Sequence, residues 1–264
     1  MGFKKNVFVD SITNRMRPFL SYVGGAVLLL VETVFLIFVP PYRKKQIISQ
    51  LYKIGVSSLP IVFLTAMFTG IVLALQSAYQ MQRISAQMYI PSLVALSMTR
   101  ELGPVLTALV VAGRVGASIT AEIGTMKVTE QIDALETLAA NPVKYLVVPR
   151  FVALFLMLPL LTVYADFIGM FGGYLVGVYK LHLSPNLYLN MTTNPLVLKD
   201  LFSGLFKSCV FAMIIAIIGC YEGFKTSGGA EGVGKATTVS LVNSFILIIA
   251  ADCVFTALFY FIGS

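Results

Sequence analysis

The sequence contains no tryptophan, a single histidine and only three cysteines. His182 has no HExxH motif and no cluster of cysteine and histidine around it, so we expect neither a metalloprotease nor a zinc site. Cys209, Cys220 and Cys253 all lie within apolar runs, and we interpret them as small buried hydrophobic residues rather than disulfide partners or metal ligands. The sequence thus predicts no metal site and offers no catalytic constellation.

Charged residues are also scarce, at 12% of the chain, whereas soluble globular domains carry about 25%. Hydrophobic residues make up 58%, and the mean hydropathy is +0.87. The apolar runs are unbroken over about 20 residues, which suits spanning helices, whereas the strands of a membrane β-barrel would alternate over about ten. The chain is therefore predicted to be an all-α polytopic membrane protein. The net charge of +7 is scattered, so we expect no nucleic-acid partner.

About five apolar segments are predicted to span the membrane in a single transmembrane domain, residues 1–264. They run from about Ile54 to Ala78, Leu93 to Thr120, Val143 to Val178, Leu196 to Tyr221 and Val239 to Ile262. An earlier apolar run, Val23 to Val39, has basic residues on both sides and is followed by Pro40-Pro41. We interpret it as an interfacial elbow helix within residues 1–46, rather than as a span.

The basic residues indicate the topology. If the amino terminus is cytoplasmic, the cytoplasmic loops carry more lysine and arginine than the outer loops, as the positive-inside tendency requires. The cytoplasmic residues are then Lys4, Lys5, Arg114, Lys127, Lys144, Arg150, Lys225 and Lys235, and the outer ones are Arg83, Lys180 and Lys199. An odd number of spans places the carboxyl terminus on the outer side.

Charges recur every three residues in the stretch from Glu122 to Pro142, between the second and third predicted spans. The charged residues at these steps are Lys127, Glu130, Asp133 and Glu136, and apolar residues at helical spacing are Val128, Ile132, Leu135 and Ala139. The spacing predicts a short amphipathic helix that ends near Asn141-Pro142. Such a helix lies in water against a partner or on the membrane surface; a solvated connecting loop is the alternative.

A glycine-rich segment, Gly229 to Lys235, reads GAEGVGK and fits the G-x-x-x-x-G-K pattern of a phosphate-binding loop. That loop also needs serine or threonine next and a strand before it. Here Ala236 follows, and membrane helices flank the segment. We therefore exclude nucleotide binding and predict a flexible cytoplasmic connection.

Ionisable residues within membrane spans are costly and usually mark function. The candidates are Arg100, Glu101, Arg114, Asp166, Lys207, Glu222 and Asp252. They are either buried ion pairs that fix helix packing or the polar wall of a cavity for a substrate with an ionic head. Leu73, Gln80, Met81 and Ile84 share one helical face of mixed polarity, which suits an amphiphile with acyl chains, although ordinary helix packing explains the same pattern.

Two other functions remain open from these residues. An ion-coupled secondary transporter could use Asp166, Glu222 or Asp252 as proton sites. A structural membrane anchor would use the buried charges for assembly only.

Two segments resemble the MlaE (YrbE) family of permeases. They read TRELGPVLTALVVAGRVGASITAEIGTMKVTEQIDALETLAANP, over residues 99–142, and GGAEGVGKATT, over residues 228–238. With the spacing of the apolar segments, the resemblance covers nearly the whole chain from about residue 45. It implies the permease of an ABC-type transporter in the Gram-negative inner membrane. Such a transporter moves phospholipid between the inner and outer membranes and maintains outer-membrane lipid asymmetry.

The resemblance also implies partners. Family members are homodimers that work with a cytoplasmic ATPase (MlaF), a STAS-domain protein (MlaB) and a periplasmic MCE-domain hexamer (MlaD). This chain would then be no enzyme and bind no cofactor, because ATP and Mg would be used by the ATPase. The stretch 122–142 would be the coupling helix, with its contacts to the ATPase at Glu122, Lys127, Glu130, Asp133 and Glu136.

The same resemblance assigns a lipid site. Arg100 and Glu101 match the polar pair at the family's outer-facing lipid cavity, with a lipid phosphate near Arg100. The positions that line this cavity are Leu73, Gln80, Met81, Ile84 and Leu102, and Lys207 and Asp252 match charged positions inside the bundle. The carboxyl terminus would be periplasmic.

Overall fold

The structure is a computed structural model that describes residues 7–41 and 43–263, with side chains described for 20–41 and 43–261. Over these residues all regular structure is helical, which confirms the all-α prediction. Six segments are long and apolar enough to cross a membrane: Leu20–Ile37, Lys44–Gln82, Gln87–Val128, Val143–Tyr179, Leu198–Lys225 and Gly229–Phe261. Five of them overlap the predicted spans, and the first overlaps the predicted elbow.

The helices that precede the second span are α1 (Val7–Ile37), α2 (Lys44–Ile54), η1 (Val56–Ser58) and α3 (Leu59–Gln82). The second span is built from η2 (Gln87–Tyr89), α4 (Ile90–Ser97), η3 (Met98–Leu102), α5 (Gly103–Val111), η4 (Ala112–Gly116) and α6 (Ala117–Val128). Then come α7 (Gln131–Thr137), η5 (Val143–Val147), α8 (Val148–Tyr179), α9 (Pro185–Thr193), α10 (Leu198–Lys225) and α11 (Gly229–Gly263).

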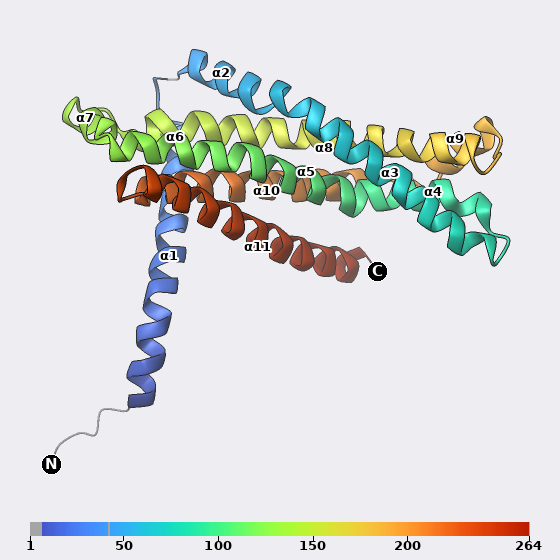
Figure 1. Cartoon of the computed structure of the whole chain (residues 1–264), viewed down its shortest axis with the longest axis horizontal. Coiled ribbons are helices and arrows are strands. Elements are labelled where there is room, and N and C mark those ends of the chain that lie inside the picture. The colour runs from blue at the N-terminus through green and yellow to red at the C-terminus, as the bar shows by residue number, and fades with distance from the viewer. Residues whose placement is uncertain (1–6, 42, 264) are drawn as a thin grey trace.

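The five spans that follow α1 form an elongated bundle, with α7 at one end and α9 at the other (Figure 1). Helix α8 contacts α3, α5 and α10 and belongs to the most buried span, whereas the apolar window of α11 is largely exposed. Because α8 has neighbours on several sides, its sequence is apolar all round rather than on one face. The bundle therefore centres on α8, and α11 presents a largely exposed apolar surface.

Glycines allow α3, α8 and α9 to approach closely. A Cβ atom added at Gly70 of α3 would overlap the carbonyl oxygen of Gly169 in α8. A Cβ added at Gly177 would overlap the Tyr188 ring, which α9 packs against α8. Burial also raises the pKa of the Tyr188 phenol above its ordinary value. Small residues of this kind let membrane helices pack backbone to backbone.

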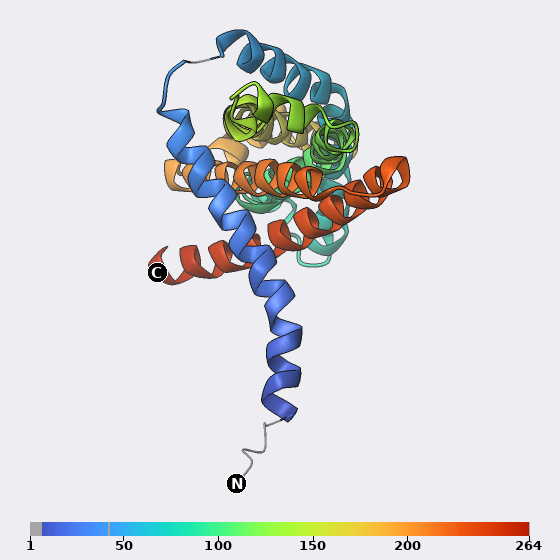
Figure 2. The same cartoon turned by 90° about the vertical axis from the view of Figure 1, so that its left-hand side faces the viewer.

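Helix α1 lies across the bundle rather than alongside the other long helices (Figures 1 and 2). Its neighbours are η5, α8 and α10, near the α7 end. Because Leu20–Ile37 is also long and apolar enough to span, the interfacial elbow stays a prediction. The elbow helix is longer than the predicted run and ends at Ile37. Lys4 and Lys5, which we used for the topology, lie outside the described residues.

The second span is interrupted by two π-helical turns, η3 and η4, and η5 makes a third before α8. Pro104 follows η3, and proline has no N–H to donate to the carbonyl oxygen of Arg100 four residues earlier. A π-turn redirects the side chains that it carries, and such turns are frequent at functional sites. Here the turns carry the cations Arg100, Arg114 and Lys144.

Two predictions for the segments between the spans are wrong. The segment Gly229–Lys235 is not a flexible connection, because it forms the first turns of α11 and the link from α10 is only residues 226–228. The stretch 122–142 is not one helix, since α6 continues to Val128 and only the seven residues of α7 form a separate helix. Glu130 lies before α7 and Ala139 lies after it. Both residues have left-handed backbones, with φ values of 60° and 56°. Helix α9 was not predicted.

Candidate functional site

A buried lysine connects three elements in the half of the bundle nearer α9. The Nζ atom of Lys207, in α10, lies 2.7 Å from a carboxylate oxygen of Glu101 in η3 and 2.9 Å from Asp252 in α11. It also donates to the Thr256 hydroxyl at 2.8 Å and to the Arg100 carbonyl oxygen at 3.1 Å. The side chain of Lys207 is only 2% exposed, so its charge is compensated almost entirely by these neighbours.

Arg100 and Glu101 do not pair with each other but with different residues of α10. The guanidinium of Arg100 contacts Asp200 through Nε at 2.8 Å and through Nη2 at 2.7 Å. Asp200 also accepts a hydrogen bond from the N–H of Val197, at 3.3 Å, and so caps the start of α10. The sequence reasoning missed Asp200, whose only signal was its place in the first turn of a predicted span.

The Arg100 side chain is 53% exposed, although Asp200 beside it is buried. A guanidinium that keeps one face accessible can still receive an anion such as a phosphate. Glu101 is half-buried and its oxygens are occupied by Lys207 and Thr256. Of this adjacent pair, Arg100 keeps an accessible guanidinium, and Glu101 holds η3 against α10 and α11.

The five predicted cavity-lining residues divide into two groups. Leu73, Met81 and Leu102 are half-buried and pack on a second hydrophobic cluster, which joins α3, α4, η3 and α8. Gln80 lines an open depression on α3 together with Leu75, Gln76 and Tyr79. Ile84 follows the end of α3 and is 69% exposed. The structure thus brings three of the five together and leaves Gln80 and Ile84 on the surface.

The other predicted intramembrane charges lie apart from the Lys207 cluster. Arg114 donates from Nη1 to the Ser58 hydroxyl at 2.7 Å, which ties η4 to η1. Asp166 of α8 is 4% exposed, and its Oδ1 has no hydrogen-bond partner among the described residues. It lies so close to Gly103 that a Cβ added there would overlap Oδ1. Arg114 therefore joins two helices, whereas Asp166 is a buried carboxyl with an unpartnered oxygen.

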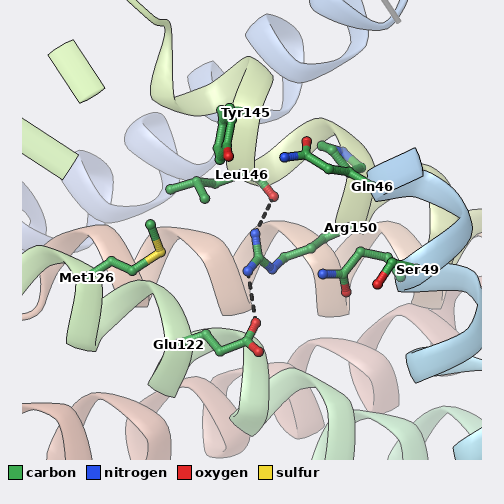
Figure 3. A pocket seen from close by; sticks show the side chains of 9 residues that line it. Gln46, Ser49, Glu122, Met126, Tyr145, Leu146 and Arg150 are labelled. Carbon is green, nitrogen blue, oxygen red and sulfur yellow. Dashed lines mark hydrogen bonds and ion pairs between the residues drawn. The ribbon is translucent and has the colours of Figure 1, made fainter. Parts of the chain in front are cut away.

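A second ionic cluster lies at the α7 end. Glu122 of α6 pairs with Lys53 of α2 through one oxygen and with Arg150 of α8, at 2.8 Å, through the other. Arg150 also donates to the carbonyl oxygen of Leu146 at 2.7 Å (Figure 3). Glu122 therefore joins three helices, and its carboxylate is half-buried. The sequence reasoning used Arg150 only as a topology marker and did not single out Lys53.

Helix α7 presents most of its charges to solvent. Ile132 is buried and Leu135 is half-buried, which packs α7 on the core. Glu130, Asp133 and Glu136 are exposed, and Lys127 at the end of α6 pairs with Asp133 at 2.8 Å. The amphipathic pattern was thus correctly predicted, and its polar side is available at the very end of the bundle.

No group of three or more histidine, cysteine, aspartate or glutamate residues that could hold a metal ion occurs within the described part of the chain. The three cysteines are free. Cys220 is buried and Cys209 is half-buried, but Cys253 is exposed on α11, so the expectation of burial is wrong for that residue.

Comparisons with known proteins cover nearly the whole chain. The family described as "Permease MlaE" matches residues 47–258. A probable ABC transporter permease protein of Rickettsia felis is 50% identical over 251 residues, which cover 95% of this chain and 97% of the relative. A probable ABC transporter permease protein of Synechocystis is 46% identical and covers 80% of each chain. The intermembrane phospholipid transport system permease protein MlaE of Haemophilus influenzae is 34% identical, over 97% of this chain and 98% of the relative.

Proposed function

The chain belongs to the MlaE permease family, and we propose that it is the membrane subunit of an ABC-type transporter that moves phospholipid between the inner and outer membranes of a Gram-negative cell. It is a multi-pass membrane protein by the length and apolarity of its helices. The printed names of its relatives support the ABC assignment, and the name of the Haemophilus influenzae relative supports the phospholipid substrate.

The observation that carries the substrate is the half-exposed guanidinium of Arg100, two residues from Leu102. Leu102, Leu73 and Met81 pack on one hydrophobic cluster, so η3 carries an accessible cation and also contributes to an apolar cluster with α3. A phospholipid has this combination of groups. Its phosphate would meet Arg100, and its chains would gain about 0.8 kcal/mol for each methylene removed from water. Gln80 and Ile84 would extend the surface at the outer end of α3.

The contacts of Lys207 hold the η3 turn that carries Arg100. Lys207 bonds the backbone of Arg100 and the side chain of Glu101, and it reaches Asp252 on α11. Because η3, α10 and α11 meet at one buried ammonium, a relative movement of α11 would shift the turn that carries Arg100. The buried charges thereby act as positioning residues for the lipid site.

Helix α7 would receive the force of the ATPase. Its exposed carboxylates Glu130, Asp133 and Glu136, with Lys127, are proposed to contact the ATPase directly. Glu122 is occupied by Lys53 and Arg150, so its contribution would be to transmit the movement of α7 and α6 to α2 and α8.

The remaining partners follow from the family. We propose a homodimer, an MlaF-like ATPase that uses ATP and Mg, an MlaB-like STAS protein and an MlaD-like MCE hexamer. The apolar window of α11 is 11% buried, which leaves a surface for lipid or for a second copy. In this arrangement the amino terminus and α7 are cytoplasmic, and α9 and the carboxyl terminus are periplasmic.

Gentle detergent purification of the tagged chain, followed by mass spectrometry of bound proteins and lipids, tests this function. We expect an ABC ATPase, an MCE-domain protein and phospholipid to be recovered together. Recovery of the chain with neither an ATPase nor phospholipid would contradict the proposal.

A further inference from the structure

A cavity of about 410 Å³ opens between α2, α6 and the start of α8. Its wall includes Gln46, Ser49, Gln50, Glu122, Met126 and Arg150 (Figure 3). It lies at the α7 end of the bundle, whereas η3 with Arg100 lies in the half nearer α9 (Figure 1). The cavity is therefore separate from the proposed transport site.

Arg150 contributes a buried cation with an unused donor. The residue is only 7% exposed. Its Nη1 donates to the Leu146 carbonyl oxygen and its Nη2 to Glu122, but its buried Nε has no hydrogen-bond partner among the described residues. Buried donors without partners are unfavourable, and a guanidinium donor is best matched by an anionic oxygen. The wall of the cavity thus includes a residue whose covered Nε favours an acceptor.

Gln46, on α2, adds a second unmatched atom to the same wall. Its Oε1 is buried and has no partner within the described residues. Figure 3 shows Gln46 on the α2 side and Arg150 between Leu146 and Glu122. A ligand with an anionic oxygen and a hydroxyl or amino group could satisfy both residues. At about 410 Å³ the cavity is larger than the roughly 30 Å³ that one water occupies.

The surroundings carry excess positive charge. A smaller cavity of about 160 Å³ shares Gln50 and Glu122 with the first and is lined by Lys53 and Arg114. Lys53, Arg114 and Arg150 are cationic, and Glu122 is the one acidic residue in the two walls. One carboxylate cannot neutralise three cations, so the region attracts anions.

Other parts of the larger cavity's wall are apolar or aromatic and distinguish among anions. Met126, Tyr145, Leu146 and Pro149 contribute to its wall. An inorganic anion would leave this surface unused, whereas the glycerol and upper chains of a phospholipid would cover it. The cavity also opens beside α2, which begins the segment Lys44–Gln82. This segment is long and apolar enough to cross a membrane.

From these contacts we propose that the cavity between α2, α6 and α8 binds the phosphate-bearing head group of a membrane phospholipid, with Arg150 as its principal anion ligand. The phosphate would lie against Arg150 and accept from Nε after a small rotation that uncovers this buried atom, and a hydroxyl or amino group of the head would donate to Gln46 Oε1 after a similar movement. The bound lipid would fasten α2 to α6 and α8, next to the Glu122 ion pairs. This site does not depend on the transport function, because the lipid would bind whether or not the chain moves lipid elsewhere.

Native mass spectrometry of the full chain in detergent tests the site with three probes. Dioctanoyl phosphatidylglycerol carries both phosphate and chains, dioctanoylglycerol lacks the phosphate, and inorganic phosphate lacks the chains. Ser49→Trp places a large side chain on the cavity wall and keeps both partners of the Arg150–Glu122 ion pair. Ile48→Trp introduces the same side chain at the neighbouring position, which is 65% exposed and outside the cavity wall, and serves as the control.

We expect one dioctanoyl phosphatidylglycerol fewer on Ser49→Trp than on the wild type or Ile48→Trp. Arg150→Lys retains the charge but has no Nε donor, and should bind that lipid about tenfold more weakly. If Arg150→Lys does not fold, the comparison of Ser49→Trp with Ile48→Trp still tests whether the cavity holds lipid. Lipid bound at Arg100 is unaffected by either tryptophan, so failure here is distinguishable from failure of the transport proposal.

Three results would overturn the inference. Equal lipid binding by Ser49→Trp and Ile48→Trp would show that the cavity holds no lipid. Equal binding of dioctanoylglycerol would show that the phosphate is not recognised. Inorganic phosphate that binds the site as tightly as the lipid does would show a site for a soluble anion instead.

Discussion

The ammonium of Lys207 donates to the carbonyl oxygen of Arg100 at 3.1 Å. Pro104, four residues beyond Arg100, cannot supply the backbone donor that an α-helix would place there. Lys207 supplies one instead, and the same ammonium contacts Glu101 and Asp252. Lys207 thus bonds a carbonyl of the π-helical turn, and its pairs with Glu101 and Asp252 compensate the charge of a side chain that is 2% exposed inside the bundle.

Lys207→Met should destabilise the protein strongly. It leaves Glu101 and Asp252 without their cation and removes the donor to the Arg100 carbonyl. Removing one partner of a buried ion pair typically costs about 3–5 kcal/mol. Thermal unfolding in detergent measures the effect, and Lys199→Met, which removes an exposed lysine from the first turns of the same helix, is the matched control. Equal unfolding temperatures for the two variants would refute the role of Lys207.

Arg100→Gln combined with Asp200→Asn should reduce bound phospholipid while it preserves the fold. The double change removes both charges, so no buried carboxylate is left unpaired, and the amide oxygen of the new asparagine can still accept from the Val197 N–H. The lost charge-assisted bond to phosphate should weaken lipid retention by about tenfold. Quantitative lipid mass spectrometry checks this, with Arg83→Gln, an exposed arginine after α3, as the control. Undiminished lipid in the double variant would show that Arg100 serves α10 alone.

Asp133→Lys should separate the chain from its ATPase. The change reverses an exposed charge on α7 and replaces attraction to Lys127 with repulsion. Because Ile132 still packs α7 on the core, the chain itself should remain folded. Co-purification of the ATPase is the measurement. Glu231→Lys reverses an exposed carboxylate at the start of α11 and controls for net charge. An ATPase that is lost equally from both variants would argue against a specific α7 contact.

Gly70→Ala should lower stability by about 1–3 kcal/mol, as overpacking typically does. The added Cβ would overlap the Gly169 carbonyl oxygen, and backbone must move to relieve this contact. Gly24→Ala is the opposite case, since nothing lies within 4 Å of its added Cβ. Alanine is favoured over glycine in a helix by roughly 0.5–1 kcal/mol, so Gly24→Ala should be neutral or stabilising. A thermal shift of the same sign and size in both variants would contradict the close α3–α8 contact.

The apolar runs predicted the helical class and the approximate spans, because hydrocarbon thickness fixes the length of a spanning helix. The partners of the charged residues could not be predicted. Arg100 pairs with Asp200, a hundred residues away, and Glu122 pairs with both Lys53 and Arg150. Such pairs depend on the packing of whole helices and on the π-helical turns, which carry no periodic signal in the sequence.

Two local errors have identifiable causes. The glycines of Gly229–Lys235 suggested a loop, but this segment continues into a long apolar helix, and the packing of α11 outweighs the weak helix propensity of glycine. In the stretch 122–142 the three-residue spacing of the charges continues across Glu130. The backbone at Glu130 is left-handed, and this turn separates α6 from α7. A period of three or four residues shows which side is polar, but it does not show a break of one or two residues.

Transfer of fluorescent phospholipid from vesicles that contain the purified complex tests the central claim most directly. The account predicts that transfer needs ATP and Mg, is unaffected by a proton gradient and is abolished by Asp133→Lys. Transfer driven by a proton gradient without ATP, and unchanged by Asp133→Lys, would contradict an ATPase-coupled permease.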